Sequence, residues 1–530
     1  MSIAQELYVW RLAGAATWHA VVFLLVITPL FGVLWPGSSW TSGVNWAGCV
    51  AYSFFYALHF GVLFAHRMVL SAREATPIYY PQLGLHGRSW LAAFLSRVFL
   101  RGRKMQDLIS VSALLGSTCF CATTFLYGYP KLRGSPATLT FSSRYGLMLG
   151  LLYTIQHLAR CRDVLAYPSV HRHRYFRLRR QMPALLFSSL RIAAAALAIT
   201  AATGRVLPEG GAVGLITTLH AGWLCAMGYV LGAELLQIVF TERLNLGTLG
   251  SSTAPVSAAL RPALEALAIP NAVVQDQVLQ ELALVAEGSG RSDAAWRATV
   301  FADETGATGW TPLAGFLLTE LREFVGQVAA ALPATAADAR TVAAATSGGK
   351  SPAPMQWNVL SASPTTGLRG VSKGQDNAAW VVRANFHRLG FCIRALAALG
   401  ASSRAEDRYG VVLLCQPALA DVLVALLSCV SALQAYSRLV SSMTSRSVGP
   451  AARALQGVMD AVSAPAHPTL HQVEYCAYAL EDLARASVYR LVRAFGPSLK
   501  ATLSELRTKP PHGTPADAAA LLASFLAYAE

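Results

Sequence analysis

Residues 12–35 read LAGAATWHAVVFLLVITPLFGVLW, and residues 44–64 read VNWAGCVAYSFFYALHFGVLF. Between Arg11 and Arg67 the sequence contains no Asp, Glu, Lys or Arg. A helix that crosses the hydrocarbon core of a bilayer needs about 20 predominantly apolar residues, and each run is long enough. The stretch therefore predicts two membrane-spanning helices joined by a short turn.

The composition extends this interpretation to much of the chain. Of its 530 residues, 54% are hydrophobic and 13% are charged, whereas about a quarter of the residues of an ordinary soluble protein are charged. A polytopic membrane protein with about six spans is expected. The four further apolar runs are Leu108–Tyr129, Phe141–Ala159, Pro183–Thr203 and Val213–Ala233.

The positive charge is concentrated in the first half and alternates between loops. Residues 1–240 carry 20 Lys/Arg against 6 Asp/Glu, and residues 241–530 carry 23 against 22. Seven Lys/Arg fall in residues 67–104 and seven in residues 160–180, while the other loops are poor in them. By the positive-inside rule these two loops are cytosolic, so both termini are predicted to be cytosolic too.

These two basic loops are the candidate membrane interface, with anionic lipid as the expected partner. In the first loop, apolar residues recur at helical spacing beside arginines, which indicates either an interfacial helix or an N-terminal extension of the third span. We expect these residues at the interface: Trp90, Phe94, Arg97, Arg101, Arg103, Lys104, Arg172, Arg174, Arg177, Arg179 and Arg180.

The second half reads as an all-α cytosolic domain with no alternating strand pattern. We divide the chain into a six-helix transmembrane domain (1–240), a first helical segment (241–332), a low-complexity flexible linker (333–377) and a second helical segment (378–530). The predicted helices are Val256–Ala268, Asn271–Glu287, Asp293–Phe301, Thr311–Leu332, Ala378–Leu399, Tyr409–Val440, Ala451–Ala464, Thr469–Phe495 and Ala516–Ala529.

Catalytic signatures are missing from the sequence: it has no P-loop, no G-x-S-x-G, no H-E-x-x-H and no kinase motif. Its nine cysteines form no C-x-x-C pair. We expect no enzyme, no cofactor, no catalytic residue and no metal site. Arg191 lies within the fifth predicted span and Glu234 directly follows the sixth. The alternative is a transporter or membrane enzyme with a cytosolic regulatory tail, in which both residues would line a substrate path.

Three stretches carry a resemblance to a known family. Residues 165–180 read LAYPSVHRHRYFRLRR, residues 393–412 read IRALAALGASSRAEDRYGVV, and residues 483–496 read LARASVYRLVRAFG. With the order of six spans, a helical set, an insert and a second helical set, the chain resembles transmembrane nucleoporins of the nuclear-division-cycle type. The residues taken as family markers or partner-docking positions are Pro168, Glu406, Asp407, Arg408, Tyr409 and Gly410. From the residues alone, the charged run before an apolar helix is a capping arrangement.

The resemblance implies a structural role in the nuclear pore complex, which supports mRNA and protein transport. The chain would anchor the pore scaffold in the pore membrane of the nuclear envelope and support pore assembly. Family partners are the beta-propeller nucleoporin Aladin and a membrane-binding nucleoporin with an RNA-recognition-type fold, with no direct contact to nucleic acid. A homo-oligomer of the chain within the pore ring is a further possibility that the resemblance leaves open. The insert is shorter and less rich in Ser and Pro than in animal members, so regulation through it is not implied.

Overall fold

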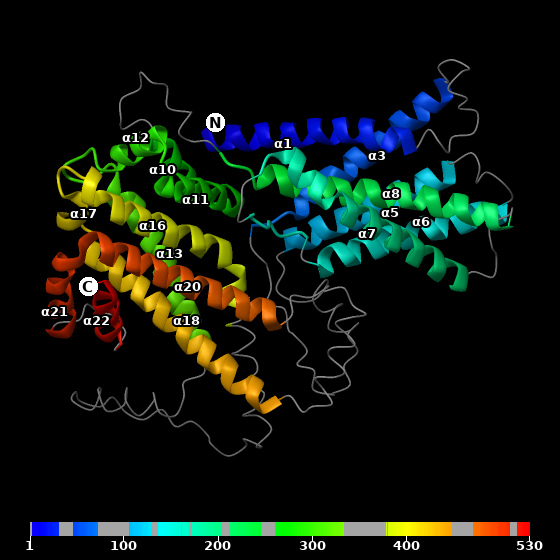
Figure 1. The fold of residues 1–530 in the computed structure, drawn as a ribbon. Helices are drawn as coiled ribbons and strands as arrows, with labels where there is room; N and C mark the ends of the chain where they lie inside the picture. The colour runs from blue at the N-terminus through cyan, green and yellow to red at the C-terminus, as the bar shows by residue number, and fades with distance from the viewer. Residues whose placement is uncertain are drawn as a thin grey trace. The chain divides into compact units, whose positions relative to one another are not determined.

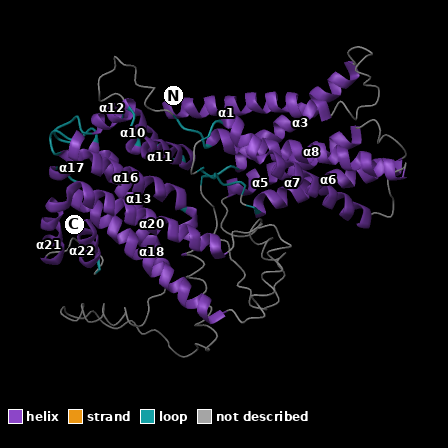
Figure 2. Cartoon of the chain, in the orientation of Figure 1, coloured by secondary structure: helices purple, strands orange, loops and turns teal. Residues whose placement is uncertain are grey.

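A computed structural model describes most of the predicted helices. The described residues are 3–30, 46–72, 105–128, 136–160, 162–168, 172–203, 211–244, 260–332, 378, 380–447, 470–508 and 517–529. They are helical almost throughout and contain no strand, only an isolated parallel bridge between Ser71 and Val164 (Figure 2). The all-α class is therefore confirmed.

The chain folds as two compact units, described here one at a time. Unit 1 takes the described residues of Met1–Ala75, Ser89–Leu244 and Asn271–Gln277, and unit 2 takes those of Asn245–Pro270 and Val278–Glu530. The predicted linker at residues 333–377 and the predicted helix Ala451–Ala464 lie outside the described residues.

Unit 1 is a bundle of long helices built around the last of them. Helix α8 packs against α1, α3, α5, α6 and α7 and is buried over most of its length. Such burial follows from its composition, because a helix that is apolar on every side has no face suited to water. The helices of unit 1 are α1 (Ile3–Val22), continued by the π-helical turn η1 (Phe23–Ile27), α3 (Trp46–Val69), α5 (Met105–Gly128), α6 (Pro136–Ala159), α7 (Arg174–Thr203) and α8 (Gly211–Phe240) (Figure 1).

Five described helices are long and apolar enough to cross a membrane, which supports a polytopic membrane protein. Four are in unit 1, namely Val9–Leu30, Leu108–Tyr127, Arg174–Thr203 and Val213–Phe240. Helices α3 and α6 are not among the five; within otherwise apolar sequences, α3 carries two histidines and an arginine, and α6 carries one histidine and one arginine. The fifth, Leu419–Arg438, lies in unit 2, where the sequence predicted a cytosolic helix.

The fifth predicted span starts earlier than the sequence indicated. Helix α7 begins at Arg174, and Pro183 lies inside it instead of at its start. The sequence analysis placed the start of this span at Pro183, where the apolar run begins. The first two turns of α7 therefore carry the basic residues that were assigned to a loop.

Small residues let α5 and α6 approach each other closely. A Cβ atom built on Gly150 would lie 2.5 Å from the backbone nitrogen of Cys119, and one on Gly146 would lie 2.6 Å from Cα of Thr123. The two glycines are four residues apart and so lie on the same face of α6. This is the small-residue packing by which membrane helices associate, since lipid supplies no hydrophobic drive between them.

Unit 2 is a helical domain whose core lies between α13, α16, α18 and α20. The predicted helix Tyr409–Val440 is wrong, because the chain forms α17 and α18 with Gln416 and Pro417 between them. Proline lacks the amide donor that a continuous helix would need there. The helices are α10 (Arg261–Ala268), α11 (Ala272–Glu287), α12 (Arg291–Val300), α13 (Trp310–Ala331), α16 (Phe386–Glu406), α17 (Val411–Leu414), α18 (Leu419–Ser447), α20 (Leu470–Phe495), the 3-10 turn η5 (Gly496–Ser498), α21 (Leu499–Thr508) and α22 (Ala518–Ala529).

Candidate functional site

Six residues of the predicted membrane interface belong to the first basic loop. The interfacial-helix residues of the first basic loop lie outside the described residues, namely Trp90, Phe94, Arg97, Arg101, Arg103 and Lys104. The second basic loop and the start of α7 are described, and they form the candidate site of unit 1.

The C-terminal end of α8 is capped by arginines from two other helices. Arg11 donates to the carbonyl oxygens of Val239 (3.1 Å), Phe240 (3.2 Å) and Glu242 (2.6 Å). Arg177 donates to the carbonyl oxygen of Ile238 over 3.1 Å. The last carbonyls of a helix have no partner within it and carry partial negative charge, so guanidinium groups stabilise them.

A third arginine fixes the chain directly after α8. Arg174 forms an ion pair with Glu242, in which Nε lies 2.8 Å from Oε1 and 2.7 Å from Oε2. Because Arg11 lies in α1 and Arg174 starts α7, these contacts bring the beginning of α1, the beginning of α7 and the end of α8 to one end of unit 1.

The segment between α6 and α7 is fastened to the same end. The side-chain amide of Gln237 donates to the carbonyl oxygens of Arg162 (3.1 Å) and Val164 (2.8 Å), and its oxygen accepts from the backbone nitrogen of Ala166 (3.1 Å). On the other side, the amide of Ser71 donates to the carbonyl oxygen of Asp163 over 2.8 Å. The end of α3 and the end of α6 therefore join the three ends named above.

This fastened segment forms one wall of a basic pocket of about 550 Å³. Its other walls are the first turns of α7 and the last turns of α8, and the only acidic lining residue is Glu234. The lining residues are Arg160, Arg162, Val164, Ala166, Tyr167, Pro168, Arg172, Phe176, Arg177, Arg180, Gln181, Ala233, Glu234 and Gln237.

The structure separates the predicted basic residues into three groups. Arg172, Arg177 and Arg180 line the pocket, Arg174 is held by Glu242, and Arg179 is exposed outside the pocket. Pro168, predicted as a family marker, also lines it. Two of the lining arginines, Arg160 and Arg162, were not predicted as site residues, although the charge count over residues 160–180 included them.

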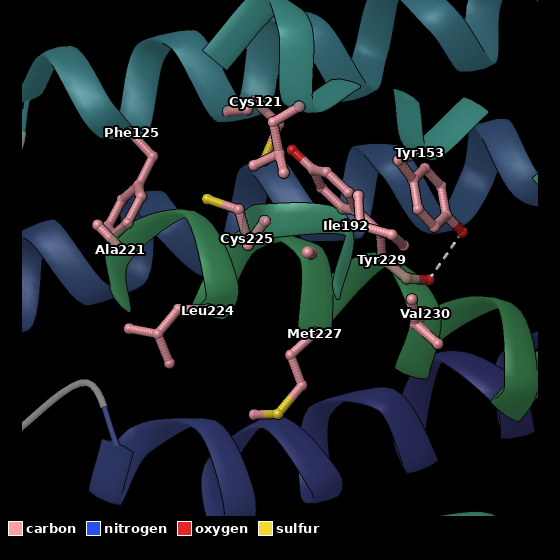
Figure 3. Close-up of a cluster of buried hydrophobic side chains, with 14 of the residues drawn as sticks. Cys121, Phe125, Tyr153, Ile192, Ala221, Leu224, Cys225, Met227, Tyr229 and Val230 are labelled. Atoms are coloured by element: carbon pink, nitrogen blue, oxygen red, sulfur yellow. Dashed lines mark hydrogen bonds between the residues drawn. The ribbon is translucent and has the colours of Figure 1, made fainter. Parts of the chain in front are cut away.

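A buried polar network crosses the interior of unit 1, which the sequence analysis missed. Nε2 of His66 lies 2.5 Å from the Tyr153 hydroxyl, and this hydroxyl donates to the carbonyl oxygen of Tyr229 over 3.2 Å (Figure 3). His157 lies on the next turn of α6, with Nδ1 3.4 Å from the same hydroxyl. Polar groups on facing membrane helices hydrogen-bond to each other because lipid offers them no alternative partner. In the sequence, the four-residue spacing of Tyr153 and His157 indicates that the two side chains lie on the same face of α6.

The alternative reading placed Arg191 and Glu234 along a substrate path. Glu234 lines the basic pocket, whereas Arg191 does not, and its side chain is exposed on α7. Among the described residues, no group of three or more His, Cys, Asp or Glu side chains is arranged to hold a metal ion.

In unit 2, the predicted charged run is partly structural. Glu406 accepts from Arg297, with Nη2 2.7 Å from Oε1 and Nε 3.0 Å from Oε2, and this pairing raises the pKa of Arg297. Arg297 also donates to the carbonyl oxygen of Val285. Asp407 accepts from the backbone nitrogen of Val412 over 3.0 Å and so caps α17.

The rest of the run faces outward. Gly410 has φ +69°, a conformation that non-glycine residues rarely adopt, and it turns the chain into α17. Arg408 and Tyr409 are exposed before that turn, and Leu413 and Leu414 are exposed after it, the latter at 80%. Two adjacent leucines this exposed, next to an exposed tyrosine, mark a candidate contact surface.

Hydrogen bonds and close packing around α17 hold this surface in place. Trp310 donates to the carbonyl oxygen of Pro417 over 2.8 Å, and Thr311 donates to that of Gln416 over 3.1 Å. A Cβ on Gly306 would lie 2.6 Å from Cγ1 of Val411, so the turn at Gly306 packs directly on α17. The exposed residues therefore rest on a rigid support.

The fold and these sites define an all-α polytopic membrane protein with a separate helical domain. Residues 371–505 match the model of a protein family described as Nucleoporin protein Ndc1-Nup, and this match supports a transmembrane nucleoporin of the Ndc1 type. No curated protein matches the chain in sequence. The matched residues include two of the three resemblance stretches, 393–412 and 483–496, while 165–180 lies outside them.

The family is one of structural nucleoporins, and the match implies a role in the nuclear pore and interaction with other pore components. Together with the apolar helices of unit 1, the match supports a location in the nuclear pore membrane.

Proposed function

We propose that this protein anchors the scaffold of the nuclear pore complex in the pore membrane and supports pore assembly. The observation that carries the proposal is the combination, in one chain, of a bundle with apolar helices long enough to span a membrane and a helical domain that matches a nucleoporin family. The bundle holds the membrane, and the domain is free to bind soluble scaffold.

We further propose that both termini face the cytosol. One end of unit 1 holds the beginning of α1, the ends of α3 and α6, the beginning of α7 and the end of α8. Both termini of the bundle lie at the same end when the chain crosses the membrane an even number of times. That end carries the arginines, and cytosolic ends of membrane helices are enriched in Lys and Arg. Unit 2 follows α8 and is then cytosolic.

Anionic lipids of the nuclear envelope are the proposed membrane partner. Basic residues next to membrane helices are attracted to negatively charged lipid at about 1 kcal/mol for each Lys or Arg near the surface. Arg179 is exposed near the start of α7, so its side chain is available to anionic lipid. The first basic loop, with Trp90, Phe94 and Arg97, is proposed to act in the same way.

The proposed docking surface for soluble partners consists of Arg408, Tyr409, Leu413 and Leu414. Tyrosine and arginine are the residue types that most often contribute large binding energies at interfaces. Glu406, Asp407 and Gly410 then act indirectly by holding the surface in shape. The partners that the resemblance implies are Aladin and a membrane-binding nucleoporin with an RNA-recognition-type fold, and a second copy of the chain within the ring is a further proposed partner.

Imaging of the full chain with a C-terminal tag tests the anchor. We expect a punctate nuclear rim and a tag that protease removes after the plasma membrane is permeabilised. A plasma-membrane or vacuolar signal would contradict the proposal and favour a transporter. A chain truncated after Thr241 should still insert but should no longer recruit partners, and recruitment by this truncated chain would place the docking surface in the membrane half.

The docking surface is tested separately by the double variant Tyr409→Ala with Leu414→Ser. We expect loss of co-purifying nucleoporins with the rim signal retained. The control is Tyr475→Ala, because Tyr475 is also exposed in unit 2, at 67% against 48% for Tyr409, but lies on α20. Equal recruitment by the double variant and the wild type would remove this surface from the proposal.

A further inference from the structure

The basic pocket of unit 1 has more positive charge than the fold uses. Five arginines and one glutamate line it, which leaves an excess of four positive charges. Arg177 is occupied by the end of α8. The guanidinium groups of Arg160, Arg162, Arg172 and Arg180 make no hydrogen bond or ion pair with another described residue.

Gathering cations without hydrogen-bonded partners costs free energy because like charges repel. Arg160 and Arg162 are partly buried, whereas Arg172 and Arg180 are exposed at the pocket. The walls are nevertheless held in place: Gln237 binds the segment 162–168 through three hydrogen bonds, and Arg174 fixes the start of α7 through Glu242. A pocket that keeps unpaired arginines in fixed positions is preorganised for an anion.

The position of the pocket points to the source of that anion. It lies where α6 ends, α7 begins and α8 ends, and each of these helices continues away from it as a long apolar segment. The mouth is therefore at the level where the bilayer meets water. Basic pockets between membrane helices on the cytosolic side are typical sites for polyanionic lipid headgroups. Tyr167 and Phe176 add aromatic surface to the lining, as is common near the headgroup region.

We propose that this pocket binds the phosphate-bearing headgroup of a polyanionic phospholipid, with Arg162, Arg172 and Arg180 as its direct phosphate ligands. Guanidinium groups suit this task because their planar donors match phosphate oxygens in pairs. A volume of about 550 Å³ is large enough for a phosphorylated sugar-like headgroup. This inference deepens the proposed anchoring role and rests on it for the side of the membrane. Such a pocket would make the anchor selective for a phosphorylated headgroup, which basic residues spread over the surface would not do.

The test uses the purified full chain and native mass spectrometry, with phosphatidylinositol phosphate, phosphatidylserine and phosphatidylcholine as lipid probes and inositol trisphosphate as the soluble probe. We expect phosphatidylinositol phosphate to bind most tightly. Arg180→Gln should weaken its binding by about tenfold, and the triple change at 162, 172 and 180 by about a hundredfold. The matched control is Arg179→Gln, an adjacent residue with the same charge change outside the pocket, which should weaken all anionic lipids alike, by at most about fivefold, and leave the preference for phosphatidylinositol phosphate unchanged.

A second variant keeps the test valid if the triple variant does not fold. Ala166→Trp fills the pocket from an exposed lining position without changing any charge, and the backbone hydrogen bond from Ala166 to Gln237 is retained. It should abolish selective binding of the phosphorylated lipid. Equal losses in the 179 and 180 variants, unchanged binding in the filled variant, or binding of the soluble probe without binding of the lipid would each overturn the proposal.

The two proposals fail in distinguishable ways. A protein that reaches the nuclear rim but shows no headgroup selectivity would overturn the pocket and leave the anchor in place. A protein that binds the phosphorylated lipid selectively but is located at another membrane would support the pocket and overturn the anchor.

Discussion

The side-chain nitrogen of Gln237 lies 2.8 Å from the carbonyl oxygen of Val164 and donates a hydrogen bond to it. Together with the bonds to Arg162 and Ala166, this contact makes one side chain of α8 the clamp for the whole segment that follows α6. The segment has no regular secondary structure, so its backbone groups need such a partner.

Replacing Gln237 by leucine should loosen that segment. The change keeps a side chain of similar size but removes three hydrogen bonds, and we expect a loss of about 1–2 kcal/mol in local stability. Hydrogen exchange of peptides that cover residues 162–168 measures it, and the amide of Ala166 should exchange faster. Gln181→Leu is the control, since Gln181 also lines the pocket but makes no hydrogen bond with another described residue. Unchanged exchange in the Gln237 variant would contradict the clamp.

Gly150→Ala should destabilise the membrane bundle. Its new Cβ would lie 2.5 Å from a backbone nitrogen of α5, so the helices must move apart, at a cost of about 1–3 kcal/mol. Thermal unfolding of the purified chain in detergent measures the effect. Gly116→Ala on α5 is the matched control, because nothing lies within 4 Å of a Cβ there. The interpretation would be wrong if both variants unfolded at the same temperature.

Tyr153→Phe removes the hydroxyl at the centre of the buried network. His66 then loses its side-chain partner, and the carbonyl oxygen of Tyr229 loses a donor. Hydrogen bonds between membrane helices contribute about 0.6 kcal/mol each on average and at most about 1.7. We therefore expect a modest drop in thermal stability, larger than that of Tyr127→Phe, which alters an exposed tyrosine of α5. A drop no larger than in the control would show that the network contributes nothing to stability.

Glu406→Gln should strongly destabilise unit 2. The side chain of Arg297 is 9% exposed, and without the carboxylate of Glu406 it loses its hydrogen-bonded counter-ion and keeps only the weaker attraction of Asp293. Breaking such a buried pair costs about 3–5 kcal/mol. The control is Glu265→Gln, which removes a carboxylate from the exposed pair with Arg261 and should cost less than about 0.5 kcal/mol. Hydrogen exchange of α16 and α12 reports the change, and equal protection in both variants would rule out the structural role of Glu406.

Unit 2 should lose stability in weak acid through His387. Burial lowers the pKa of His387 from 6.5 to about 4, so the folded protein prefers the neutral ring. Its contribution is complete above pH 6.5 and is lost as the pH falls from 6.5 towards 4, by at most about 3 kcal/mol. His387→Phe should flatten this part of the profile, because Phe386 and Phe391 already flank the site. Parallel profiles for wild type and variant between pH 7 and pH 5 would contradict the assignment.

The helical class, the apolar spans and the approximate ends of most helices could be predicted from the sequence, because they follow from local composition and period. The break at Pro417 could also have been read locally, and the predicted helix Tyr409–Val440 overlooked it. The extension of α7 back to Arg174 could not, because those first turns are stabilised by contacts with the end of α8.

The sequence by itself determined that this chain enters a membrane, that its basic residues gather in particular loops, and that its second half carries the marks of a nucleoporin family. These properties are local, since hydropathy, charge and short motifs are read along the chain. The tertiary structure alone decided that Arg11 and Arg177 cap α8, that Glu406 pairs with Arg297, and that arginines of α7 and of the segment between α6 and α7 share one pocket. Each of these depends on contacts between residues far apart in sequence, which form only when the helices pack.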